Sequence, residues 1–208
     1  MSEPSLKQRT IGALLWNLLD RMGQQVLLFI VGVLVANILS VEDYALVGML
    51  AIFSAIANIV LDSGFSAALI RKQDATETDY NSVFYFNIFI SACLYLLLFV
   101  CSPLIAGFFN QPLLTDLARV IFLALPFNSL SLIQTTLLNK QVSFKILTKI
   151  NLIALTASGI GSLAMAYGGM GVWTLAWQPV ILAFLRTVLL WFFNKWRPQL
   201  LFLSLIHI

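Results

Sequence analysis

Six long apolar stretches divide this chain, and they most constrain what it can fold into. Each approaches or exceeds the ~20 residues that an α-helix needs to cross the hydrocarbon core of a bilayer. An open strand in lipid would leave its backbone groups unpaired, so each stretch is predicted to be a helix. The fold class is therefore predicted to be all-α, a polytopic membrane protein built as a six-helix transmembrane bundle. The predicted spans cover residues 10–39, 44–70, 83–109, 117–138, 146–167 and 172–193.

The positively charged residues lie at alternate ends of these stretches. Nine of the twelve Lys and Arg residues lie in or beside every second gap: Lys7, Arg9, Arg71, Lys72, Lys140, Lys145, Lys149, Lys195 and Arg197. The gaps between them hold Glu42, Asp43 and Asp116 but no Lys or Arg. Because positive charge stays on the cytoplasmic side during insertion, both ends of the chain are predicted to be cytoplasmic. We divide the chain into a cytoplasmic segment (1–9), a six-helix lobe (10–194) and a cytoplasmic tail (195–208).

Composition argues against several other classes of protein. Sixty per cent of the residues are hydrophobic and only 10% are charged, with a mean hydropathy of +0.93. So few charges could not cover the surface of a soluble domain. The basic residues form no cluster with aromatic residues, which argues against nucleic acid as a partner. The single histidine is His207, and no spacing is typical of a metal site or of an activated nucleophile. We therefore expect no enzyme activity, metal or cofactor.

Loop lengths and small residues give expectations about helix packing. Several connections are only a few residues long, so consecutive helices are predicted to be antiparallel neighbours. Residues that allow close helix approach recur in the fifth span: Ala157, Ser158, Gly161 and Ser162. Prolines inside spans should kink or break them, either as packing geometry or as hinges: Pro103, Pro126 and Pro179.

Polar residues recur at helical spacing inside three of the spans. The first span carries Asn17, Arg21 and Gln24 on one face, with Asp20 at its edge. The second carries Ser54, Asn58, Asp62 and Ser66, every four residues. The sixth carries Thr174, Gln178 and Arg186 on one side. Such stripes are predicted to face other helices or a water-filled cavity, because lipid offers them no partner.

Three charged residues on different spans are predicted to lie at similar depth. Arg21 is twelve residues past Arg9, or ~18 Å along a helix, and Asp62 and Arg186 are each nine residues, or ~13.5 Å, from a terminal cation. A charge near the bilayer centre costs at least ~2.5–3.5 kcal/mol, so such charges need compensation. One alternative is a buried clasp, in which an arginine pairs with Asp20 or Asp62. The other, which we favour, is a cavity where guanidinium groups bind an anionic head group.

The order of these features resembles the oligosaccharide flippases of the polysaccharide-biosynthesis group, Wzx-like proteins of the MOP exporter superfamily. The likeness is closest to the lipopolysaccharide and colanic-acid exporter branch. The second-span motif with its following loop is the most specific part. The stretches that carry the resemblance are GALLWNLLDR (12–21), LSVEDYALVG (39–48), LDSGFSAALIRKQDATETDYNSVFY (61–85), GVWTLAW (171–177) and WFFNKWRP (191–198).

The resemblance implies a transport function. Such proteins move undecaprenyl-diphosphate-linked oligosaccharide across the bacterial cytoplasmic (inner) membrane by alternating access, in a pathway that includes glycosyltransferases and a polysaccharide polymerase. Their membrane-lipid setting and cationic cavity suggest that Arg21 and Arg186 bind the diphosphate. Asp20 and Asp62 would balance charge or couple an ion. The residues expected to line the path and bind substrate oxygens are Asn17, Gln24, Asn58 and Gln178.

The chain departs from the family pattern, and two rival functions stay open. It holds six helices where the family has twelve to fourteen, and residues 201–208 replace an expected charged stretch, so we interpret it as truncated. One rival is an ion-coupled exporter of cationic drugs, which would need a net acidic cavity. The other is a membrane scaffold that transports nothing. In that case exchanging Arg21 and Asp62 would restore a destabilised single mutant fully.

Overall fold

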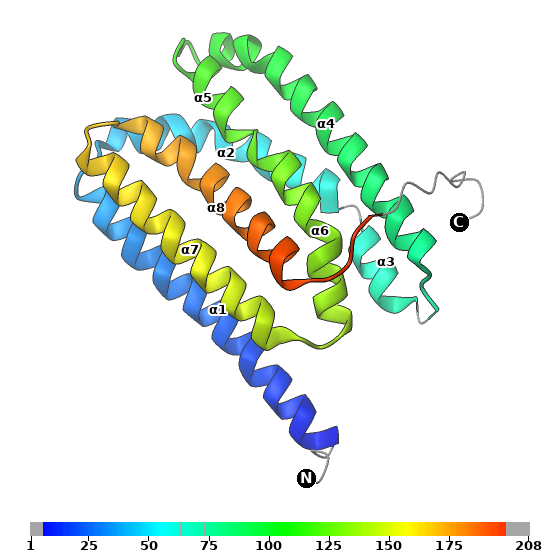
Figure 1. Cartoon of the computed structure of the whole chain (residues 1–208). Coiled ribbons are helices and arrows are strands. Elements are labelled where there is room, and N and C mark those ends of the chain that lie inside the picture. The colour runs from blue at the N-terminus through cyan, green and yellow to red at the C-terminus, as the bar shows by residue number, and fades with distance from the viewer. Residues whose placement is uncertain (1–5, 63, 73, 199–208) are drawn as a thin grey trace.

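The structure is a computed structural model and describes residues 6–62, 64–72 and 74–198. Figure 1 shows a bundle of long helices, with the chain running back and forth between its two ends. The helices of the described part are α1 (Leu6–Ala36), α2 (Val41–Asp62), α3 (Phe65–Arg71), α4 (Glu77–Phe108), α5 (Leu114–Ile121), α6 (Ala124–Lys140), α7 (Phe144–Tyr167) and α8 (Val172–Phe193). The predicted ending at 201–208 and His207 lie outside the described residues.

Six segments of the described chain are long and apolar enough to cross a membrane. They are Leu15–Ala36, Val41–Arg71, Glu77–Phe108, Leu114–Lys140, Phe144–Tyr167 and Val172–Phe193. Each overlaps one of the six spans expected from the sequence, and the described residues form no strand. The predicted fold class, an all-α polytopic bundle, is confirmed.

Two of the spans are each made of two helices. In the second, α2 ends at Asp62 and α3 begins at Phe65, after Gly64 adopts a left-handed φ of 78° that favours glycine. In the fourth, α5 ends at Ile121, five residues before Pro126. Proline has no N–H to donate to the Phe122 carbonyl, and that carbonyl accepts from Leu125 N at 3.0 Å instead.

A break in the helix is seen at one of the three prolines. Pro126 follows the break between α5 and α6, whereas Pro103 and Pro179 lie inside α4 and α8, which continue through them. Those two prolines do not end their helices, because a helix surrounded by other helices can satisfy the freed carbonyl in other ways. The other expected effect, a kink, stays a prediction at these positions.

Helix α8 lies at the centre of the bundle. It packs against α7 on one side and α6 on the other, and α1 lies along the outer side of α7 (Figure 1). Helix α2 packs against α8 and α5, and α4 packs against α5 and α6. The prediction that consecutive helices are neighbours is wrong for α1, whose main neighbour is α7. Side chains of α1 and α2 instead border a cavity together with side chains of α6, α7 and α8.

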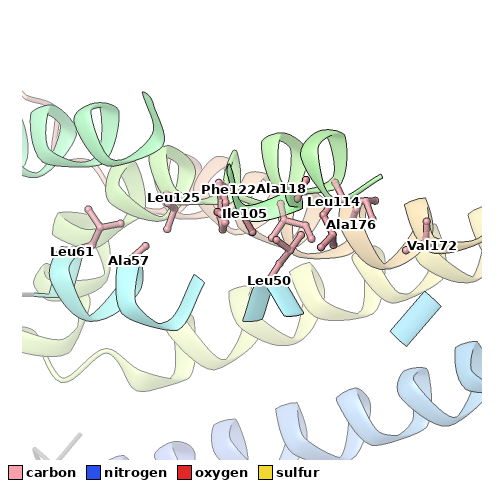
Figure 2. Packing of buried hydrophobic residues seen from close by; sticks show 13 residues of the cluster. Leu50, Ala57, Leu61, Ile105, Leu114, Ala118, Phe122, Leu125, Val172 and Ala176 are labelled. Atoms are coloured by element: carbon pink, nitrogen blue, oxygen red, sulfur yellow. The ribbon is translucent and has the colours of Figure 1, made fainter. Parts of the chain in front are cut away.

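An apolar cluster joins α2, α4, α5 and α8 (Figure 2). Its members lie between helices and are shielded by their neighbours, and the most buried are Leu50, Leu114, Leu117, Ala118, Phe122 and Ala176. Lipid tails are as apolar as these side chains, so the cluster is stabilised mainly by close van der Waals packing. The cluster fixes α5 and the break at Phe122 against α2 and α8.

Helices α1 and α7 approach each other closely at two glycines. A Cβ on Gly159 would lie 2.6 Å from Val31 Cγ2, and one on Gly23 would lie 3.1 Å from Leu152 Cδ2. The small residues expected to do this included Gly161, but a Cβ there would meet nothing within 4 Å. Gly159 lies on the α7 face toward α1, and this contact sets the distance between the two helices.

At one end of the bundle the chain after α8 is tied to α4 and α6. Trp196 Nε1 donates to Glu77 Oε2 at 2.8 Å, and Gln134 Nε2 donates to the Trp196 carbonyl at 3.1 Å. The Arg197 guanidinium donates to the carbonyls of Asn194 and Trp191 at 2.7 and 2.8 Å. We call residues 194–198 the end tether. It links two of the stretches on which the family resemblance depends.

Replacing Gly159 with alanine should destabilise the protein relative to the same change at Gly161. Alanine favours either helix position by up to ~1 kcal/mol, but overpacking against Val31 costs about 1–3 kcal/mol. In detergent, Gly159→Ala should therefore unfold at a lower temperature than Gly161→Ala. Adding Val31→Ala should recover part of the loss. Equal unfolding temperatures for the two single variants would contradict the close approach of α1 and α7.

Candidate functional site

Two adjoining cavities inside the bundle share the side chains of Asn58, Asn128 and Arg186. The first, here the mid-bundle cavity, has a volume of about 230 Å³ and mostly apolar walls. Its polar lining comes from five helices: Gln24, Ser54, Asn58, Asn128, Asn151 and Arg186. The second, here the α2–α6 groove, has a volume of about 440 Å³ and runs between those helices to Ser66 and Asn139. Because they share these three side chains, the two cavities are together called the recess.

Arg186 projects from α8 and lines both cavities. Its Nε is buried and has no hydrogen-bond partner in the described part of the chain. Asp20 attracts the guanidinium electrostatically, but among the described residues Arg186 forms no ion pair within 4.0 Å. The guanidinium therefore borders an open recess with donors that are free to bind an anion.

Asp20 is held by amide groups of α1 and α7. Gln24 Nε2 donates to Asp20 Oδ1 at 2.9 Å, and Asn151 Nδ2 lies 3.2 Å from both carboxylate oxygens. Asn151 is only 7% exposed, and its Oδ1 has no partner among the residues described. The close approach of α1 and α7 brings these groups together. Asp20 is thus fixed beside the mid-bundle cavity as a source of negative charge.

The structure brings four of the eight predicted site residues to the recess: Gln24, Asn58, Asp62 and Arg186. The other four do not line it: Asn17, Asp20, Arg21 and Gln178. Arg21 is exposed on α1, one helical turn before Gln24 on the same face. Because α1 packs along α7, its polar face borders the recess at Gln24 and Leu28 and continues past it at Arg21.

A fourth polar stripe, on α6, was missed in the sequence. Its members are spaced three or four residues apart and line the recess: Asn128, Ser131, Thr135 and Asn139. The same helical spacing that identified the other stripes could have found this one. The middle of this span holds no charged residue, since Arg119 lies on α5 near one end and pairs with Asp116 at 3.6 Å. Asn151 on α7, the only Asn or Gln of its span, was also missed.

Comparison with known proteins identifies a family. Residues 34–207 match the model of a family described as polysaccharide biosynthesis protein. The teichuronic acid biosynthesis protein TuaB of Bacillus subtilis (strain 168) is 30% identical over 202 residues, which are 96% of this chain and 42% of TuaB. The succinoglycan biosynthesis transport protein ExoT of Rhizobium meliloti (strain 1021) is 24% identical over 187 residues, 90% of this chain and 38% of ExoT.

A third relative is an uncharacterized membrane protein in the cps region of Klebsiella pneumoniae. It is 25% identical over 149 residues, which cover 70% of this chain and 30% of the relative. The chain therefore spans less than half the length of the curated relatives that it matches. No solved structure matches the chain significantly.

Exposed residues on α2 should differ in their access to water, which cysteine labelling can measure. In a background with Cys93→Ala and Cys101→Ala, Asp62→Cys should react with a charged, water-soluble thiol reagent. Ile59→Cys is the matched control, since Ile59 is 73% exposed but lines no described cavity. Apolar surroundings raise the pKa of a thiol. Each unit of increase in that pKa lowers the fraction of thiol present as reactive thiolate about tenfold. Equal labelling rates in membranes would contradict a water-filled α2–α6 groove.

Proposed function

We propose an export function from one premise: the chain belongs to the polysaccharide biosynthesis protein family. One relative is named a succinoglycan biosynthesis transport protein and another a teichuronic acid biosynthesis protein. The proposed substrate is an oligosaccharide linked through diphosphate to undecaprenol. The protein moves it across the bacterial inner membrane for surface polysaccharide synthesis, by alternating access. It acts as a transporter and not as an enzyme.

The observation that carries this proposal is Arg186 beside the recess. A lone charge deep in a membrane costs at least ~2.5–3.5 kcal/mol, yet this guanidinium has no ion-pair partner within 4.0 Å among the described residues. Guanidinium groups bind phosphate oxygens in bidentate fashion through charge-assisted hydrogen bonds. A diphosphate in the recess would satisfy the buried Nε and neutralise the charge. The group is thus suited to bind and release an anionic substrate.

The other predicted residues have distinct roles in this proposal. Asp20, fixed by Asn151, balances the charge of Arg186 while the recess holds no substrate. Gln24 and Asn58 form hydrogen bonds with the substrate inside the recess. Asn17 and Arg21 lie on the continuation of the same α1 face, along the approach to it. Gln178 lies on α8, about two helical turns from Arg186, along the onward path.

The orientation of the bundle fits a substrate made inside the cell. We place both described ends of the chain in the cytoplasm, because Lys72, Lys140 and Arg197 gather at that end. The α2–α6 groove reaches the same end at Asn139, beside Lys140. A sugar diphosphate can enter there while its lipid tail stays among the acyl chains. Asp62, at the groove wall, would balance charge or couple an ion.

Deleting the gene in the organism that carries it should lower surface polysaccharide and cause lipid-linked oligosaccharide to accumulate. The wild-type gene should restore export, whereas Arg186→Gln should lower it about 10- to 100-fold, because a charge-assisted pair is worth roughly 1.5–3 kcal/mol. Arg119→Gln is the matched control and should restore export fully. Surface polymer, precursor and membrane protein level are measured in parallel.

Two results would contradict the proposal. Normal polymer output from Arg186→Gln at normal expression would remove Arg186 from the transport path. Resistance to cationic drugs that tracks expression, with polymer unchanged, would favour the rival drug exporter.

A further inference from the structure

The α2–α6 groove is lined by oxygen atoms that the proposed diphosphate contact does not use. On α2 they belong to Asn58 and Asp62, and on α6 to Ser131, Thr135 and Asn139. Arg186, at one end, is the only Lys or Arg that lines the groove among the described residues. A space formed this way inside an apolar bundle is costly unless a polar ligand or water fills it.

Several of these side chains already use their own donors within the protein. Ser131 Oγ donates to the Asn128 carbonyl at 2.8 Å, and Thr135 Oγ1 donates to the Ser131 carbonyl at 2.9 Å. Asn58 Nδ2 donates to the Ser54 carbonyl at 2.8 Å. What these groups still offer a ligand is mainly their oxygen lone pairs. An ionised Asp62 also accepts only.

The acceptor oxygens of this surface select a ligand that can donate hydrogen bonds, and the amide groups of Asn128 and Asn139 can in addition donate to it. Sugar hydroxyl groups donate as well as accept, so they can pair with these oxygens. An ionised diphosphate has acceptors only and would be repelled by Asp62, whereas Arg186 has donors only and attracts it. A lipid tail would leave the polar wall unpaired. The recess therefore separates two chemistries along its length.

We propose that the α2–α6 groove is the sugar-recognition subsite of this transporter, with Thr135 and Asn139 as specificity-determining residues. The inference rests on the proposed function, in which Arg186 holds the diphosphate at the inner end of the same groove. The sugar then lies toward the Lys140 end, with its hydroxyl groups donating to α2 and α6. The volume of about 440 Å³ is within the ~300–1,000 Å³ range of small-ligand sites.

The test compares two lipids that differ only in the sugar. The 208-residue chain is purified into lipid nanodiscs, and native mass spectrometry measures the Kd of undecaprenyl diphosphate and of undecaprenyl diphosphate carrying glucose. Wild-type protein should bind the glucose-bearing lipid more tightly. Thr135→Val and Asn139→Leu should each weaken binding of that lipid about threefold to tenfold, the effect of one lost hydrogen bond, and leave the bare lipid unchanged.

Control variants separate this inference from the proposed function. Thr115→Val makes the same chemical change on α5, outside both cavities, and should leave both Kd values unchanged. Arg186→Gln should weaken both lipids alike. Thr135→Val preserves shape, so it tests the subsite even if Asn139→Leu fails to fold.

The outcomes are distinct. If the α6 variants change neither lipid, or both equally, while Arg186→Gln weakens both, the sugar subsite is overturned and the diphosphate role of Arg186 stands. If Arg186→Gln changes neither lipid, the diphosphate proposal fails. Selective loss of the glucose-bearing lipid in the α6 variants supports the subsite.

Discussion

A guanidinium deep inside an apolar bundle must be compensated, and the arrangement around Arg186 follows from that need. Neighbouring helices supply what lipid cannot: a carboxylate from α1, amides from α1, α2 and α7, and hydroxyl groups from α6. Asp20 compensates from a distance and does not form a contact pair, which leaves the guanidinium donors accessible. A direct buried ion pair between Arg186 and Asp20 would hold the two helices together more tightly, but it would leave fewer guanidinium donors for a ligand.

The place of α1 decides how this compensation is arranged. Gly23 and Gly159 let α1 lie against α7, and that contact turns Asp20 toward Asn151. The two glycines therefore set how α1 borders the recess, through Gln24 and Leu28.

Much of the architecture could be predicted from hydropathy, because membrane helices must satisfy their own backbone and be long enough to cross. The number of spans and the helical class followed directly, as did the polar stripes containing Gln24, Asn58, Asp62 and Arg186. Helix neighbours could not be predicted, since they depend on local shape, such as the gap at Gly159. From the sequence alone, Arg21 and Arg186 were therefore expected to line the same cavity, although only Arg186 lines the recess.

The end tether has a consequence for how such proteins diverge. Its bonds join Trp196 and Arg197 to α4, α6 and the end of α8, so two of the stretches by which this chain resembles its family help to hold the helices together. The polar stripe of α6 lies outside them. Two family members could then share all five stretches and still bind different substrates. Similarity judged from those stretches alone would not identify the substrate of either one.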